Sequence, residues 1–184
     1  MVPLTSLLLP ILLSAVAVFL VSAVIHMALG YHADDFARAP DEDAVRNALR
    51  GIPGGDYAVP RAGSMADMKS PEYLAKVKAG PIVTMTVQPG REMSMARELT
   101  LWFVYLLVVS VFAGYVAGRA LEPGADYLDV FRFAGTTALV AYALSSWPDT
   151  IWYKRSTRTS LKNTFDGIVY ALVTAGMFGW LWPS

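Results

Sequence analysis

The charged residues of this chain are gathered between long uncharged stretches. A helix needs about 20 mostly apolar residues to cross the hydrocarbon layer of a membrane, and four stretches approach or exceed that length. The third is the shortest, with sixteen uncharged residues, and needs flanking residues to complete a crossing. The pattern predicts four membrane-spanning helices, over residues 4–30, 98–119, 128–148 and 165–183.

A polar insert of 67 residues, 31–97, separates the first two predicted spans. Ser70 precedes a proline and an acidic residue, which is a typical helix start. A second short helix is expected after the acidic run 41–43. The β-branched stretch 82–87 predicts a strand, which we expect to pair with residues around 57–59. The fold class is therefore an all-α membrane protein, a four-transmembrane-helix bundle with a small α+β extramembrane insert between helices 1 and 2.

Composition agrees with a membrane protein and narrows the function. Hydrophobic residues make up 55% of the chain and charged residues only 16%. Fifteen basic and fifteen acidic side chains give a formal net charge of zero, so no overall field attracts nucleic acid. Without cysteine, the chain has no disulfide, thiolate metal site or thiol nucleophile. The expected partners are the lipid bilayer and other membrane-protein subunits or further copies of this chain, with no nucleic acid.

The loops between the predicted spans indicate an orientation. Four crossings place both termini on one side with the short connection 119–132, which carries two Lys or Arg residues. The third connection carries four, and lies on the same side as the insert. Because cytoplasmic loops are enriched in Lys and Arg, we expect the insert in the cytoplasm and both termini outside. The tryptophans lie near the ends of these spans, as interfacial tryptophans do.

Two histidines and two aspartates near the end of the first span are the candidate ligand-binding residues. His26 and His32 are the only histidines, and Asp34 and Asp35 follow them. Imidazole and carboxylate groups suit a divalent metal or a proton relay. Six positions along a continuous helix separate the histidines too far for one ion, so a shared site requires the helix to end near Gly30. The alternative is that His26 lies at the membrane interface, hydrogen-bonded to Ser22.

Small residues recur at four-residue spacing on two predicted spans. In lipid, helices associate through close backbone approach, which small residues permit. We therefore expect helix packing at these positions, within one chain or between chains. The helix-packing candidates are Gly114, Gly118, Gly167, Ala171, Ala175 and Gly179.

The chain carries no recognisable catalytic motif. Ser-x-x-Lys, His-Glu-x-x-His and Gly-Lys-Ser are all absent from the sequence. No charged residue falls inside a predicted span, and Asp166 is expected at the start of the fourth. A proton-coupled carrier usually depends on a membrane-embedded carboxylate, and the predicted spans of this chain contain none. These features predict a protein that is not an enzyme.

Three strings resemble a family of small, uncharacterised integral membrane proteins of bacteria. They are HMALGYHADDF, LWFVYLLVVSVFAGYVAGRAL and DGIVYALVTAGMFGWLWP, and together the resemblance extends over most of the chain. The resemblance implies a multi-pass protein of the bacterial cytoplasmic (inner) membrane and its number of helices. It carries no assigned activity and therefore no site residue.

Two functions remain open at this point. The first is a non-enzymatic accessory, scaffold or assembly subunit that engages a partner through its helix bundle or its insert. The second is a metal-, haem- or pigment-binding membrane protein centred on His26 and His32. The second function requires the candidate side chains to lie within ligand distance of one another, and the sequence leaves the cofactor undetermined.

Overall fold

The computed structural model describes residues 1–92 and 94–184, and divides into two compact units. The helical unit combines Met1–Phe36 with Ser94–Ser184, and the insert unit comprises Ala37–Met93. Residues 31–36, which the sequence pattern assigns to the insert, therefore belong to the helical unit.

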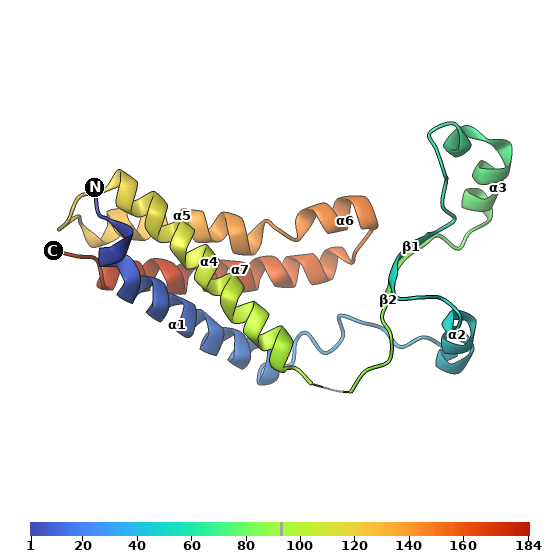
Figure 1. Cartoon of the computed structure of the whole chain (residues 1–184), viewed down its shortest axis with the longest axis horizontal. Coiled ribbons are helices and arrows are strands. Elements are labelled where there is room, and N and C mark those ends of the chain that lie inside the picture. Colours follow the sequence, from blue (N-terminus) through green and yellow to red (C-terminus); the bar gives the residue numbers. More distant parts are fainter. Residues whose placement is uncertain (93) are drawn as a thin grey trace. The chain divides into compact units, whose positions relative to one another are not determined.

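Four long helices form the helical unit (Figure 1). A short 3-10 turn, Leu4–Leu7, leads directly into the first of them. A further short helix, α6, precedes the last long helix and contains a proline in its first turn. The helices are α1 (Leu8–Met27), α4 (Ala96–Ala120), α5 (Tyr127–Ala143), α6 (Trp147–Tyr153) and α7 (Thr157–Trp180).

The helices pack through small residues that lie at contacts within the chain. α5 and α7 make the most extensive contact, and α1 lies against both α4 and α7. A Cβ atom on Gly167 would lie 2.6 Å from the backbone of Ala143, so the two helices touch there without a side chain between them. Gly114 faces Phe178, and Gly118 lies against the backbone of Val2. The remaining helix-packing candidates also lie at contacts within the chain: Ala171 and Ala175 are buried, and Gly179 contacts Tyr127.

Over its described residues, the insert unit contains a two-stranded antiparallel sheet, two short α-helices and a 3-10 turn, Asp67–Lys69. β1 (Gly55–Val59) pairs with β2 (Val83–Val87), with Tyr57 opposite Met85, which confirms the predicted strand pairing. α2 (Glu42–Leu49) begins after Asp41, whose carboxylate accepts from the Ala44 backbone N–H. α3 (Pro71–Ala79) begins after Ser70, whose hydroxyl accepts from the Tyr73 backbone N–H. Both predicted helices are confirmed, and the residues that indicated their starts, Asp41 and Ser70, make the expected capping hydrogen bonds.

Among the residues that the structure describes, two helices are long and apolar enough to cross a membrane: Leu4–Met27 and Ala96–Ala120. α5 has 17 residues, slightly fewer than a perpendicular crossing needs. α7 has 24 residues, but its first turns carry charged side chains such as Arg158 and Lys162. The structure is thus mostly helical with two candidate spans, and the bundle of four spans stays a prediction.

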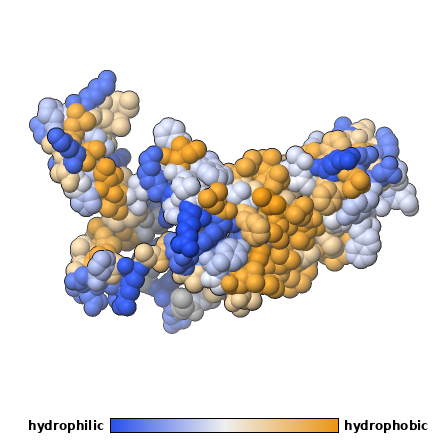
Figure 2. Space-filling model, turned by 180° about the vertical axis from the view of Figure 1, so that it is seen from behind, coloured by the Kyte–Doolittle hydropathy of each residue, from blue (hydrophilic) through white to orange (hydrophobic). Residues whose placement is uncertain are grey.

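Large apolar side chains cover the outside of the helical unit. Figure 2 shows a hydrophobic band across this unit with hydrophilic residues beyond it. The exposed side chains come from all four long helices and include Leu20, Phe112, Val140 and Leu172. Contiguous apolar surface of this kind marks contact with lipid or with another protein.

Candidate functional site

The two histidines come together because α1 ends between them. The helix stops at Met27, and Gly30 adopts a left-handed conformation (φ 66°) that side chains with a Cβ rarely take. The chain then turns back, so that the rings of His26 and His32 lie with their centroids 4.5 Å apart. This is the helix ending near Gly30 that a shared ligand site requires.

Asp166 joins the histidines from α7 and is only 3% exposed. The expectation that Asp166 lies at the start of its helix is wrong, since α7 begins at Thr157 rather than near residue 165. The hydroxyl of Ser156 accepts from the Thr159 backbone N–H and starts the helix earlier than hydropathy indicates. Asp166 therefore lies in the third turn, with its carboxylate inside the helical unit.

The three side chains form a compact group of ligand atoms. One carboxylate oxygen of Asp166, Oδ2, lies 2.8 Å from His32 Nε2 and 4.0 Å from His26 Nε2. One ligand atom from each of the three residues lies within 4.8 Å of the other two. In a tetrahedral zinc site, bonds of 2.0–2.1 Å place neighbouring ligand atoms roughly 3.3 Å apart. The observed distances fall on both sides of this value, so small side-chain rotations would allow all three to bind one cation.

His32 lies between two carboxylates, and this limits its possible states. Its Nδ1 is 2.6 Å from Asp35 Oδ2, while its Nε2 faces Asp166. A neutral imidazole has one N–H, so it donates to only one of the two carboxylates. When Nδ1 donates to Asp35, the Nε2 lone pair faces a carboxylate oxygen, and two electron-rich atoms at that distance require a cation between them. Either a second proton or a metal ion meets this requirement.

Asp34 and Asp35 do not enter the group of three, but anchor the segment that carries His32. Lys162 of α7 donates to Asp35 at 2.7 Å and to Asp34 at 2.6 Å, and Arg158 pairs with Asp34 at 2.8 Å. Hydrogen bonds from Lys162 hold the pKa of both carboxyls below their ordinary value, and the two carboxylates raise the pKa of Lys162. Both aspartates are therefore ionised over the physiological pH range, and Asp35 is able to orient His32.

Two tyrosines complete the surroundings of the group. The Tyr31 hydroxyl donates to the second carboxylate oxygen of Asp166, Oδ1. Desolvation, followed by this hydrogen bond, raises the pKa of Tyr31, so its hydroxyl stays protonated. His26 Nε2 lies 3.4 Å from the Tyr170 hydroxyl. The expected bond from His26 to Ser22 is not formed, because the Ser22 hydroxyl donates to the Phe19 carbonyl and accepts from the Trp102 indole N–H.

Two open cavities meet at this group. The polar cavity, of about 590 Å³, is lined by His26, His32 and Asp35 together with the start of α7. The aromatic cavity, of about 620 Å³, is lined by His26 and Asp166 together with aromatic rings of α4, α5 and α7. The ligand atoms are therefore accessible from the surface of the helical unit.

Of the residues singled out in the sequence, the structure brings His26 and His32 within ligand distance and adds Asp166 to them. Two imidazoles and a carboxylate are a donor set suited to a divalent transition metal. The sequence does carry a signal for Asp166, since Lys162, Asp166 and Tyr170 recur every four residues and form a polar stripe on one face of α7. That stripe is visible only when the helix is extended back to Thr157.

Comparisons with models of known protein families, with curated proteins and with solved structures gave no match.

Proposed function

We propose that this chain is a multi-pass protein of a bacterial cytoplasmic membrane, in which α1, α4, α5 and α7 all cross the bilayer. The exposed apolar side chains on all four helices support four crossings rather than two. α5 alone is slightly too short to cross, but α5 together with the residues between it and α6 is long enough. The charged start of α7 then lies at the interface, where long basic side chains are tolerated.

The absence of cysteine allows this topology to be tested with single cysteines. Pro123→Cys marks the connection between α4 and α5, and Thr157→Cys marks the start of α7. An impermeant maleimide is expected to label Pro123→Cys in intact cells, and to label Thr157→Cys only after permeabilisation. Labelling of both in intact cells would contradict a crossing by α5, whereas exchange of the two patterns would reverse the orientation and leave the four crossings in place.

The function that the site supports best is binding of a divalent transition-metal cation, with zinc as the first choice, by His26, His32 and Asp166. The observation that carries this proposal is the His32 imidazole held between two carboxylates, with Nδ1 on Asp35 and Nε2 on Asp166. Metal-ligating histidines commonly donate their second ring N–H to a carboxylate, which fixes the tautomer and orients the ring. Zinc would here replace the second proton that this arrangement otherwise needs.

Zinc content is the direct test of this function. The protein is purified in detergent, treated with a chelator, reloaded with zinc and separated from free metal by gel filtration. One zinc per chain is expected in the wild type, and none in the His26→Ala/His32→Ala double variant. Wild-type protein that retains no zinc while remaining folded would contradict a zinc site at these residues.

Asp35 and Asp34 offer a matched pair of variants for the role of the supporting carboxylate. Both are ion-paired to Lys162, but only Asp35 contacts His32. Loss of such a supporting partner typically weakens metal affinity about 10- to 100-fold. We expect Asp35→Asn to weaken zinc binding by that factor and Asp34→Asn to change it less than about threefold, as measured by competition with a chromogenic chelator. Equal losses in the two variants would mean that the charge of the segment, not the contact with His32, matters.

A second candidate function is that of an accessory subunit, and the insert unit favours it. None of its described residues, 37–92, is buried. A segment that buries so little of its own surface gains stability from a partner. Native mass spectrometry of the gently solubilised protein is expected to show companion subunits or further copies of the chain if this function holds. A single chain without companions would argue against it.

A further inference from the structure

We infer that the bound metal has a free coordination position, and that this position takes the protonated oxygen of an amphipathic molecule whose ring or apolar body lies in the aromatic cavity. This inference rests on the proposed metal site and names the ligand class of the same site. The ligand is a bilayer-soluble compound with a hydroxyl-type oxygen at one end.

The metal would have three ligands from the protein. The group supplies three ligand atoms, one each from His26, His32 and Asp166. Structural zinc sites are closed by four protein ligands, whereas sites with three keep a position for water or another ligand. Both cavities are lined by His26, and each is lined by one of the other two ligands. A molecule in either cavity therefore lies beside the ligand atoms.

One wall of the aromatic cavity consists of aromatic side chains. Four aromatic rings that line it contact one another in a closed circuit: Trp102, Tyr105, Tyr142 and Tyr170. The centroid distances around the circuit are 5.5, 6.0, 5.8 and 6.1 Å. Aromatic pairs favour stacked or edge-to-face geometry at such distances. A flat ring is therefore the body that this wall accommodates best.

The polar groups that line the aromatic cavity determine which chemical group the polar end of the ligand carries. Two carboxylates, Glu98 and Asp166, line the cavity, and no lysine or arginine does. Ionised carboxylates accept hydrogen bonds and donate none, so these two groups favour a ligand whose polar end carries a proton.

The aromatic cavity reaches the apolar surface of the helical unit. Tyr105 and Leu101, which line the cavity from α4, are 38% and 53% exposed on the apolar surface of the helical unit. A lipid-soluble molecule is therefore able to reach the cavity from the side, without passing through water.

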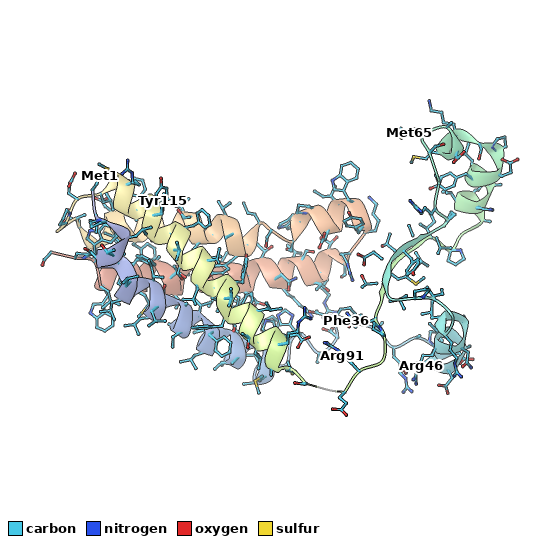
Figure 3. All side chains as sticks on the ribbon, in the orientation of Figure 1. Met1, Phe36, Arg46, Met65, Arg91 and Tyr115 are labelled. Carbon is cyan, nitrogen blue, oxygen red and sulfur yellow. The ribbon has the colours of Figure 1, made fainter. Side chains whose placement is uncertain are left out.

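Hydroxamic acids are suitable probes, because they are neutral in solution and bind divalent metals through oxygen. Binding to the metal releases the hydroxyl proton of the probe, and the Glu98 carboxylate that lines the cavity is able to accept it. Cobalt(II) replaces zinc in the protein, and its visible bands report binding of the probe. We expect benzohydroxamic acid to bind at least about tenfold more tightly than acetohydroxamic acid, because its ring is buried against the aromatic wall. Tyr105→Leu is expected to reduce this ratio severalfold. Tyr115→Leu is the matched control, since Tyr115 is an exposed tyrosine on the same helix that does not line the cavity (Figure 3).

The outcomes separate this inference from the proposed metal site. Cobalt binding with a high ratio that falls in Tyr105→Leu and persists in Tyr115→Leu supports the inference. Cobalt binding with a ratio near one, or a ratio equally affected in both variants, overturns it and leaves the metal site intact. Failure of the wild type to bind cobalt would remove the metal site and the inference together.

Discussion

Asp166→Asn is expected to weaken zinc binding by at least about 100-fold, more than loss of a supporting residue does. The substitution keeps the shape of the side chain and removes the negative charge that lies between His26 and His32. A neutral amide is a poor ligand for zinc, which binds nitrogen, sulfur and carboxylate oxygen in proteins. The measurement is chelator competition on detergent-purified protein.

Asp149→Asn is the control for Asp166→Asn. Asp149 lines the polar cavity, as the ligands His26 and His32 do, but does not belong to the group of ligand atoms. Its substitution changes the net charge equally and is expected to leave zinc affinity within about threefold of the wild type, because exposed charges interact weakly through water. Similar losses in the two variants would mean that zinc is held by the field of the cavity rather than by Asp166.

Gly167→Ala is expected to lower the free energy of unfolding by about 1–3 kcal/mol, because it inserts a methyl group where two backbones touch. Three backbone atoms of Tyr142 and Ala143 lie 2.6 Å from the position of the new Cβ. Backbone atoms in a packed helix cannot rotate away as a flexible side chain does, so α5 and α7 must separate. Loss of intrinsic tryptophan signal during thermal or denaturant unfolding in detergent provides the measurement.

Gly176→Ala on the same helix is the matched control. The nearest atom to a Cβ at Gly176 is the Tyr127 hydroxyl oxygen at 3.6 Å, an ordinary contact. Alanine favours helix over glycine by up to about 1 kcal/mol, so this variant is expected to be neutral or slightly more stable. If both variants were equally stable, close packing of α5 on α7 would not determine the stability of the bundle.

Local features of the sequence predicted local structure well. Ser70 and Asp41 cap the helices that they announce, and the β-branched stretch 82–87 supplies the strand that pairs with β1. Helix caps and strands depend on neighbouring residues and on backbone preferences, and both can be judged from the sequence alone. The resemblance to a family of bacterial membrane proteins rests on the three sequence strings and gains no support from the comparisons.

The candidate site was only partly accessible from the sequence. The sequence indicates His26 and His32 as candidates, on the condition that the helix ends near Gly30, and the structure meets that condition. Asp166 was missed, since hydropathy placed the start of its helix beside it, whereas the Ser156 cap starts α7 earlier. The roles of Asp34 and Asp35 depend on Lys162, which is more than 120 positions away in the chain. Contacts at such separation follow from the packing of α7 and not from local pattern.

X-ray absorption at the zinc edge tests the metal site most directly. Protein loaded with one equivalent of zinc is expected to show two imidazole ligands and oxygen ligands at about 2.0–2.1 Å, with no sulfur. The His32→Ala variant, if it retains zinc, is expected to show one imidazole fewer. A first shell without imidazole, or a spectrum unchanged in His32→Ala, would contradict binding by these three residues.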